Sequence, residues 1–332
     1  MTEYKGVMVL VESTEGKLAN ITRELLGCAR KLANQLGEEL SAAVLGNQVA
    51  ALAQEVIAYG VDKVSLADNP ILEHYSNESY TNIMEVILNQ VMPKVLLIGQ
   101  TAIGRDLAPS LAFRLGTSAI TDCIELSINV ESGQLLQTKP VYGGNLMATF
   151  VSECCPQIAT VRPKAYSPME PNNSKQGKII NIDIKPETAP ARTKVVSKVS
   201  QSKEGVRLED AAVVIGGGRG IGSAEGFKQL EELASLLGGA IGATRPPCDN
   251  GWIQDAAQIG LTGKIIAPDF YMAIAISGSS QHISGCSGAK NIIAINKDTE
   301  ANIFNVARFG IIGDWKKVIP TFTEKIRQLL TE

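Results

Sequence analysis

The sequence predicts an α/β protein built from two doubly wound domains, each with a parallel β-sheet covered by helices. The length of 332 residues is about twice that of a typical domain, so two domains are expected. Short apolar segments alternate with helical ones along most of the chain, which is typical of a parallel sheet. The segment 163–205 interrupts this alternation with many Pro, Ser, Asn, Lys and Glu residues. We therefore expect an N-terminal domain over 1–205 that ends in an extended linker, and a C-terminal domain over 206–332.

The N-terminal part alternates strands and helices in a regular order. Strands are expected at 6–11, 41–45, 63–67 and 95–99, the last of them nearly all-apolar. Helices are expected at 18–36, 49–59, 79–91 and 105–116, and Gly37 and Gly60 are suited to end the first two. From 125 to 161 the pattern changes to β-rich pieces, with turns at Gly133 and at 143–144. The strand and helix order predicts a sheet that is covered on both faces.

The C-terminal part resumes the alternation. Strands are expected at 211–215, 239–243, 264–267, 271–276 and 291–296. A glycine-rich turn at 216–223 leads into a helix at 224–237, and an amphipathic helix is expected at 316–330. Both parts of the chain thus predict a Rossmann-like or flavodoxin-like domain.

Composition and charge exclude several classes of function. The formal net charge is −3, with Lys and Arg scattered, so no surface for nucleic acid is predicted. No apolar run approaches the roughly 18 residues of a membrane-spanning helix, and the first residues lack the pattern of a signal peptide. We therefore expect no membrane insertion and a cytoplasmic protein, with an organelle matrix as the alternative.

Cysteine and histidine residues predict no metal centre. The six cysteines include no C-x-x-C motif, and with two histidines in the chain no zinc-binding cluster is expected. Cys154 and Cys155 are adjacent and could be redox-active, but we interpret them as two small apolar residues near a strand end. Any redox chemistry is therefore expected to need an imported cofactor.

The glycine-rich turn is the first chemical signal. A strand that runs through Gly216, Gly217, Gly218 and Gly220 into a helix lets backbone N–H groups approach an anion. The spacing also matches the G-x-x-x-G-I-G pattern of short-chain dehydrogenases, but the Tyr-x-x-x-Lys motif of such enzymes occurs here only at 59–63, far upstream. Nucleotide binding and a plain tight turn both remain open on this signal alone.

A second signal follows the expected strand 271–276. It is a run of small and polar residues: Ser277, Gly278, Ser279, Ser280, Gln281 and then His282. Small residues let a pyrophosphate come close to the backbone, and hydroxyl and N–H groups can donate hydrogen bonds to it. A single histidine in a loop is more often a satisfied polar residue than a ligand contact, so both interpretations of His282 stay open here.

The residues of this region carry a resemblance to a known family. The segment 268–285, PDFYMAIAISGSSQHISG, closely resembles the signature of electron-transfer flavoprotein alpha subunits, the large subunits of the FixB-like family. Further segments agree with that family in its order, at 104–109, 121–123, 217–220, 242–245, 259–264, 294–298 and 310–315. The resemblance therefore covers nearly the whole chain.

The resemblance implies one FAD, held mainly by the C-terminal domain at an interface with a smaller beta subunit, which would hold AMP or a second FAD. The positions that resemble dinucleotide contacts are Arg219, Thr244 and Asn296. Those that resemble the loop along the flavin are Ile259, Gly260, Leu261 and Thr262, with Thr262 near flavin N5. Arg245 resembles the arginine set against the ring, and His282 the histidine near its O2 edge. Ser277 to Gln281 resemble the phosphate and ribityl cradle, and Asp314 and Trp315 the region around the adenosine.

Some of these positions also have plain structural interpretations. Arg245 could form a surface salt bridge and Thr262 could cap a helix, whereas Arg105 and Asp106 are assigned only a capping and solvated role at a helix start. The chain departs from common family members at Leu261 (often Gln), Thr244 (often Ser), Cys286 (often Met) and 308–309 (often Asp-Tyr). It also lacks the N-terminal ferredoxin-like extension of some bifurcating relatives. None of these changes removes a residue expected to bind FAD.

The resemblance implies an electron carrier and no catalytic acid or base. As a heterodimer with a beta subunit, it would take electrons from an acyl-CoA dehydrogenase-like flavoprotein in fatty acid β-oxidation. It would pass them to a membrane quinone oxidoreductase or a ferredoxin, with NADH-dependent bifurcation left open. Two alternatives remain at this point: an NAD-dependent short-chain reductase, and for the first domain a nucleotide-binding module of the stress-protein type.

Overall fold

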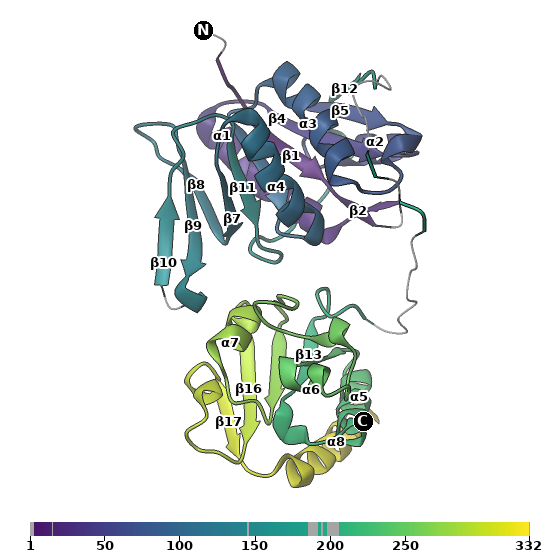
Figure 1. Ribbon diagram of the computed structural model, residues 1–332, viewed down its shortest axis with the longest axis vertical. Coiled ribbons are helices and arrows are strands. Elements are labelled where there is room, and N and C mark those ends of the chain that lie inside the picture. The colour runs from purple at the N-terminus through teal and green to yellow at the C-terminus, as the bar shows by residue number, and fades with distance from the viewer. Residues whose placement is uncertain are drawn as a thin grey trace. The chain divides into compact units, whose positions relative to one another are not determined.

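The computed structural model describes residues 3–14, 16–144, 146–184, 192–193, 195–197 and 206–331. The chain divides into two compact units (Figure 1). The N-terminal unit comprises Met1–Val141 and Met147–Val199, and the C-terminal unit comprises Tyr142–Leu146 and Ser200–Glu332. The expected boundary at 205 and the linker residues 185–191, 194 and 198–205 fall outside the described residues. Each unit contains its own parallel sheet flanked by helices, which confirms the predicted fold class.

A seven-stranded sheet forms the centre of the N-terminal unit, and its described pairings are all parallel. In spatial order the strands are β12 (Lys178–Asn181), β5 (Lys63–Asp68), β4 (Leu40–Gly46), β1 (Val7–Val11), β6 (Val95–Gly99), β11 (Gln157–Val161) and β7 (Ala119–Cys123). The chain runs outward from β1 to β4 and β5, then returns to place β6 on the other side of β1. The carboxyl ends of β1 and β6 therefore form a topological switch point.

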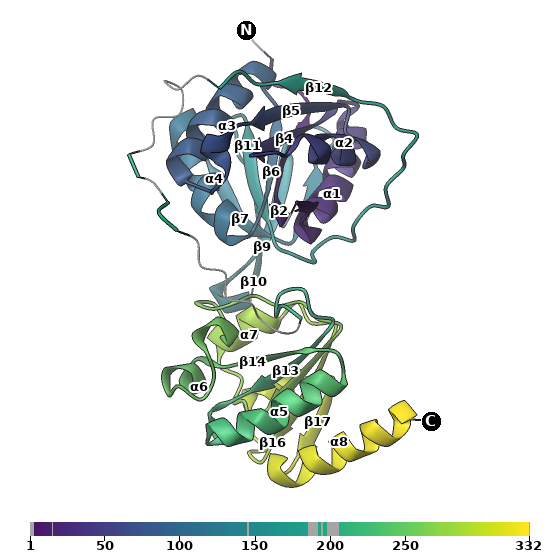
Figure 2. The ribbon, with the colours of Figure 1, turned by 90° about the vertical axis from the view of Figure 1, so that its right-hand side faces the viewer.

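Helices cover both faces of this sheet (Figure 2). The helices α1 (Asn20–Leu36) and α2 (Ala50–Ala58) pack on the side chains of Val7 and Val9, which point to one face of β1. The helices α3 (Asn77–Val91) and α4 (Ala102–Leu115) pack on the other face, against Met8 and Leu10. Alternate residues of β1 thus enter two different cores, which explains why the strand is apolar throughout.

Two helix starts differ from the sequence prediction for local chemical reasons. The first helix begins at Asn20 because Lys17–Leu18 pair with Ser13–Thr14 as a short hairpin, β3 with β2. Helix α4 begins at Ala102, since the Thr101 hydroxyl accepts a hydrogen bond from Gly104 N at 3.0 Å and caps it.

Asp106, for which a capping role was expected, lies inside α4 and does not cap it. Its Oδ2 atom accepts a hydrogen bond from the Tyr75 hydroxyl at 2.7 Å, and Asn77 donates to the same carboxylate at 2.9 Å. Asp106 therefore joins α4 to the start of α3, and Arg105 beside it is exposed.

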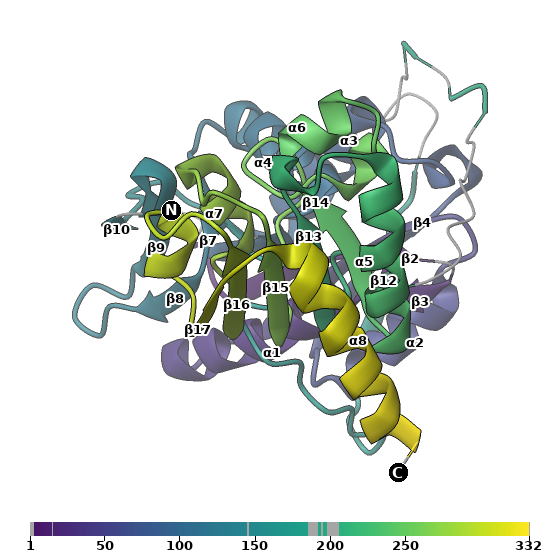
Figure 3. The ribbon, with the colours of Figure 1, turned by 90° about the horizontal axis from the view of Figure 1, so that it is seen from below.

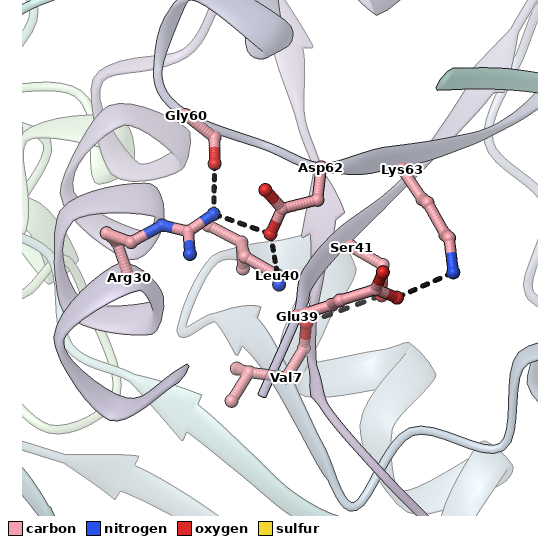
Figure 4. Close-up of polar contacts among 8 residues, drawn as sticks. All are labelled: Val7, Arg30, Glu39, Leu40, Ser41, Gly60, Asp62 and Lys63. Carbon is pink, nitrogen blue, oxygen red and sulfur yellow. Dashed lines mark hydrogen bonds and ion pairs between the residues drawn. The ribbon is translucent and has the colours of Figure 1, made fainter. Parts of the chain in front are cut away.

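Polar side chains join the amino ends of neighbouring strands in the N-terminal unit (Figure 4). Asp62 accepts hydrogen bonds from Arg30 Nη2 at 2.7 Å and from Leu40 N at 2.8 Å, while the same guanidinium also donates to Gly60 O. Lys63 pairs with Glu39 at 2.6 Å nearby. Because strands run parallel, this cluster lies at the amino edge and leaves the carboxyl edge of the sheet free for other groups.

A small antiparallel sheet accounts for most of the β-rich region expected at 125–161, whose last part is β11 of the parallel sheet. Its strands are β8 (Glu125–Ile128), β9 (Leu135–Val141) and β10 (Leu146–Phe150), in the order β10-β9-β8. Gly133 provides the turn between β8 and β9 with a φ of 64°. The 3-10 helix η2 (Tyr142–Gly144) follows β9, where the sequence predicted a glycine turn.

The C-terminal unit contains a five-stranded sheet that is parallel throughout. Its spatial order is β14 (Ala240–Ala243), β13 (Val213–Gly217), β15 (Phe270–Ile274), β16 (Asn291–Asn296) and β17 (Phe309–Ile312). The helices α5 (Ala224–Leu236) and α8 (Trp315–Thr331) lie side by side on one face (Figure 3). The opposite face is covered by α7 (Ser280–Cys286) and by the segment around Ile259 and Ile266.

Three short elements of the C-terminal unit differ from the prediction. The expected strand 264–267 does not form, because Ile266 N donates to Gly285 O at 2.8 Å instead of joining the sheet. The strand β17 was missed; its four residues are all exposed, so it lacks the buried apolar run that marked the other strands. The helix α6 (Arg245–Asp249) was also missed, and two prolines in its first turn fix its start.

Candidate functional site

The predicted site residues gather at one edge of the C-terminal sheet. Because all five strands are parallel, the residues that follow them lie at the same carboxyl edge. These residues are Gly218 and Arg219 after β13, Thr244 and Arg245 after β14, Ser277 to His282 after β15, Asn296 at the end of β16, and Asp314 and Trp315 after β17. The chain passes from β13 to β14 and then crosses to β15 on the other side. This edge therefore contains the topological switch point of the unit, where ligands of open α/β sheets bind.

The glycines of the turn after β13 allow two strand ends to approach closely. A Cβ atom on Gly216 would collide with the Tyr271 hydroxyl, and one on Gly218 would collide with the carbonyl oxygen of Ala275. Gly218 N also donates to Ile274 O at 2.9 Å. The glycines thus have a packing reason in this chain, and they leave the backbone at the switch point without side chains that would block a ligand.

Arg219 places a positive charge at this switch point. It begins the 3-10 helix η4 (Arg219–Ile221) and is exposed, and no ion pair of its guanidinium is seen within the described residues. Ser223 follows as the N-cap of α5, with its hydroxyl accepting from Gly226 N at 3.3 Å. A cation beside the start of a helix is suited to an anionic group such as a pyrophosphate.

The segment after β15 exposes several hydroxyl groups. Ser277, Ser279 and Ser280 are exposed, and Ser279 is the N-cap of α7 without a side-chain capping bond. Gly278 has a φ of 83°, and a Cβ atom there would collide with the backbone of Ile303. Only glycine therefore fits the turn that presents these hydroxyls as hydrogen-bond donors.

The loop 259–262 continues along the edge of β14. Ile259 N donates to Ala243 O at 2.8 Å, and Leu261 N donates to Gln281 O at 2.9 Å. Gly260 has a φ of 151°, which disfavours any other residue, and a Cβ atom on Gly285 would collide with the backbone of Gly260. The loop is thereby fixed between β14 and α7, with Leu261 54% exposed.

Thr262 does not begin a helix, so its interpretation as a cap was wrong. The residues after it form a turn and an extended segment. Its hydroxyl accepts a hydrogen bond from Gln258 Nε2 at 2.9 Å and remains exposed at the end of the loop.

His282 is buried, with 3% of its surface exposed, and it lies on α7 instead of in a loop. Its Nδ1 atom is 3.1 Å from Ile259 O, and its Nε2 atom is 2.8 Å from the Tyr271 hydroxyl. Burial lowers the pKa of His282 to about 4, so the ring is neutral near pH 7. Both ring nitrogens thus have protein partners.

Three further predicted residues are engaged in holding the edge together. Asn296 Nδ2 donates to Ile276 O at 2.9 Å, and its Oδ1 accepts from Asp298 N at 3.0 Å. The Trp315 indole is buried and donates to Gly220 O at 3.1 Å. Asp314 accepts from Lys316 N at 3.0 Å at the start of α8. These contacts shape the edge, and the Trp315 ring is part of the core on the α5 face.

Thr244 and Arg245 occupy the end of β14. Thr244 N donates to Gly217 O at 3.0 Å, and its side chain makes no capping bond to α6. Arg245 is largely exposed and pairs with Asp249 at 3.3 Å, one turn along α6. Such an exposed pair contributes little stability, so the guanidinium is available to another partner at low energetic cost.

The residues at this edge fit the pyrophosphate of a dinucleotide such as FAD. Arg219 and the hydroxyls of Ser277, Ser279 and Ser280 supply a cation and donors for a pyrophosphate, next to backbone that glycine keeps uncovered.

Tyr271 was not among the predicted site residues, although it is the partner of His282. A tyrosine within an otherwise apolar buried strand could have indicated it, because a buried phenol needs a hydrogen-bond partner.

The switch point of the N-terminal unit has a different character. Glu12 follows β1, and its Oε1 atom accepts a hydrogen bond from the Thr101 hydroxyl at 3.0 Å. A Cβ atom on Gly99 would lie 2.8 Å from the same oxygen, so the carboxyl group fills the space after β6. Burial raises the pKa of Glu12 to about 7. In its charged form, at and above that pH, this carboxylate disfavours a phosphate here, and so disfavours a nucleotide-binding module in this unit.

No group of His, Cys, Asp and Glu side chains suited to hold a metal ion occurs in the described part of the chain. None of the helices built from those residues is both long and apolar enough to cross a membrane.

Comparisons with known proteins agree along the whole chain. Residues 7–187 match the family described as electron transfer flavoprotein domain, and residues 207–287 match the electron transfer flavoprotein FAD-binding domain. The chain is 43% identical over 330 residues to the electron transfer flavoprotein subunit alpha of Thermoanaerobacterium thermosaccharolyticum, covering 99% of this chain and 100% of the relative. It is 40% identical to the protein FixB of Clostridium saccharobutylicum, covering 100% of this chain and 99% of the relative. It is 36% identical to a lactate dehydrogenase (NAD(+),ferredoxin) subunit, LctC, of Acetobacterium woodii, covering 96% of this chain and 76% of the relative.

Proposed function

The chain belongs to the family of electron transfer flavoprotein alpha subunits, and from this premise we propose that it holds one FAD at the carboxyl edge of its C-terminal sheet. The FAD-binding family match covers 207–287, which includes the glycine turn, the loop 259–262 and the serine-rich segment after β15. The observation that carries the proposal is the convergence of these three segments at one switch point. We assign FAD binding to 206–332 and contact with a partner subunit to 1–205.

Each part of the edge has a distinct role in this proposal. Arg219 offsets the charge of the pyrophosphate, and the serine hydroxyls donate to its oxygens. Thr244 and Arg245 lie beside the glycine turn, where the exposed guanidinium can leave Asp249 and face the flavin ring. Thr262 and Leu261 are exposed on the loop that would lie along the ring. When bound, FAD supplies the electron chemistry, while these side chains bind and orient it.

Asn296, Asp314 and Trp315 contribute to the edge indirectly in this proposal. Their polar atoms are already bonded to the backbone of the protein, so they hold the strand ends in place. All three follow residue 287, the last residue of the FAD-binding match. We propose that they fix the carboxyl ends of β15, β16 and β17 against each other, with Asp314 still exposed to a ligand.

The partners proposed are those of an electron carrier. A beta subunit with AMP or a second FAD would complete a cytoplasmic heterodimer, with an acyl-CoA dehydrogenase-like flavoprotein of fatty acid β-oxidation as donor. A membrane quinone oxidoreductase is the proposed acceptor, and a ferredoxin is the alternative one. The relative LctC, whose name includes NAD(+) and ferredoxin, supports testing the second arrangement. The family assignment supports neither a short-chain reductase nor a stress-protein-type module.

Stopped-flow absorption spectroscopy of the heterodimer distinguishes these donors. The protein is mixed with an acyl-CoA dehydrogenase and its acyl-CoA, or with NADH and oxidised ferredoxin. Loss of the flavin absorption with the first mixture alone supports the proposed dehydrogenase route. Loss with NADH, with ferredoxin becoming reduced only when the dehydrogenase and an enoyl-CoA are also added as the second electron acceptor, replaces it by a bifurcating role. A flavin that neither mixture reduces contradicts the proposed donors.

A further inference from the structure

We propose that Tyr271 is a positioning residue of the FAD site, which acts through His282 on the carbonyl group of Ile259 and so on the loop 259–262. The inference rests on the proposed function, because the loop matters only if FAD lies along it. Tyr271 itself would touch neither FAD nor the partner subunit. Its side chain is fully buried on β15, the central strand of the five-stranded sheet.

The space around the Tyr271 hydroxyl is closely defined. Gly216 lies on the neighbouring strand β13, and any side chain there would collide with this hydroxyl. On the other side the hydroxyl meets His282 Nε2 at 2.8 Å, with the two ring centres 5.9 Å apart. The first glycine of the turn thus provides room for a phenol that reaches α7.

The direction of the hydrogen bonds follows from the acceptor at the far end. A carbonyl oxygen can only accept, so the contact of 3.1 Å to Ile259 O places the ring proton of His282 on Nδ1. In a neutral imidazole Nε2 is then an acceptor, and the Tyr271 hydroxyl donates to it. Burial lowers the pKa of His282 and raises that of Tyr271, which keeps both groups neutral and the direction fixed.

The hydrogen bond from His282 to the carbonyl group of Ile259 holds the loop 259–262. The peptide carbonyl of Ile259 is fixed by His282, while Leu261 N is fixed by Gln281 O at 2.9 Å, also on α7. The Gly260 residue between them packs against Gly285 of the same helix. The backbone that presents Leu261 and Thr262 is therefore set by α7, and the ring on α7 is set by Tyr271.

Histidine-selective 15N NMR can observe this arrangement, because the sequence has two histidines and His74 is exposed. The full chain, labelled on histidine, is combined with its unlabelled partner subunit, and a His74→Gln variant assigns the signals. In the wild type we expect a neutral His282 with its proton on Nδ1. Tyr271→Phe should move the His282 Nε2 signal, leave the His74 signal unchanged, and raise the dissociation constant for FAD about fivefold, the effect of one lost hydrogen bond.

Two further variants separate positioning from general damage. Gly216→Ala keeps both rings but displaces the Tyr271 hydroxyl, so it should move the same Nε2 signal and also weaken FAD binding. Tyr59→Phe changes a buried tyrosine of the N-terminal unit and should alter neither readout. The Gly216 variant also keeps the proposal testable if Tyr271→Phe does not fold.

Each contrary outcome has its own meaning. An unmoved Nε2 signal in Tyr271→Phe, or a moved signal with wild-type FAD affinity and flavin absorption, overturns the positioning role alone. A wild-type heterodimer that takes up no FAD in this subunit overturns the proposed function, and the positioning role with it. The NMR measurement on flavin-free protein still shows in that case whether the hydrogen bonds exist.

Discussion

The Nδ1 atom of His282 lies 3.1 Å from the carbonyl oxygen of Ile259, inside the C-terminal unit. This contact fixes the protonated nitrogen, and the Tyr271 hydroxyl at 2.8 Å occupies the other one. The ring therefore has no free N–H group in this arrangement. A direct bond from His282 to the O2 edge of a flavin, which the family resemblance implies, requires one of these two contacts to be exchanged.

The lowered pKa of His282 predicts how the C-terminal unit responds to pH. Its pKa is about 4 in the folded protein against an ordinary value of 6.5, so the unfolded chain binds more protons between these values. The contribution of the neutral His282 to the free energy of unfolding is fully present above pH 6.5. About 2 to 3 kcal/mol of it is lost as the pH falls towards 4. Urea unfolding of wild type and His282→Gln between pH 4 and 7 measures this. Equal pH slopes in the two proteins would contradict the burial of a neutral histidine.

Glu12 predicts the opposite response in the N-terminal unit. Its pKa is raised to about 7, so the folded protein binds more protons than the unfolded chain above pH 4.5. Its contribution is fully present below 4.5 and is lost as the pH rises to 7. Glu12→Gln keeps an acceptor for the Thr101 hydroxyl. The difference in free energy of unfolding between this variant and wild type should shift in favour of the variant by about 1 to 3 kcal/mol from pH 4 to pH 8, as urea unfolding at both pH values measures. A gain that is independent of pH would refute this.

Gln137 offers a test of buried polar satisfaction. The side chain is fully buried in β9, and neither its Oε1 nor its Nε2 atom has a hydrogen-bond partner in the described residues. Gln137→Met should therefore raise the free energy of unfolding by about 1 kcal/mol. Gln157→Met is the matched control, since Gln157 is equally buried but accepts from Leu135 N at 2.8 Å. Gln157→Met should be destabilised, because Leu135 N would lose its acceptor. Thermal unfolding of both variants measures the difference. A higher melting temperature for Gln157→Met than for Gln137→Met would show that Gln137 forms hydrogen bonds in solution.

Gly278 and Gly238 separate a site glycine from an ordinary one. Both have a positive φ, 83° and 62°, but a Cβ atom on Gly278 would collide with Ile303 whereas one on Gly238 meets no atom within 4 Å. Gly238→Ala should cost about 1 kcal/mol of stability and leave FAD binding intact. Gly278→Ala should displace the serine-rich segment and reduce FAD retention. Flavin content after gel filtration measures this, and equal retention in both variants would remove the segment from the site.

The accuracy of the sequence prediction depended on burial. The strands β6 and β16 were predicted with their observed bounds, because both contain long apolar runs between helices or turns. The strand β17 was missed because its exposed residues follow a different pattern, with Gly310 in the middle. The segment 264–267 was apolar enough for a strand, but its partner is Gly285, which no local pattern indicates.

The candidate site divides in the same way. Its location could be predicted, since small and polar residues directly after parallel strands must meet at one edge. The partners of individual side chains could not, because they come from distant segments. Asn296 is bonded to Ile276, Trp315 to Gly220, and His282 to Tyr271, and each of these bonds depends on the packing of two strands or of a strand and a helix. Sequence spacing does not determine such contacts.

The central claim is that FAD is held at the carboxyl edge of the C-terminal sheet, and flavin content tests it most directly. The chain is purified with its beta subunit, the visible spectrum is recorded, and the released flavin is identified and counted for wild type and Gly278→Ala. The account predicts a yellow wild-type protein whose released flavin is FAD. Wild type should release one more FAD per heterodimer than Gly278→Ala, which loses the FAD of the alpha subunit. A colourless wild-type protein that also takes up no added FAD would contradict it.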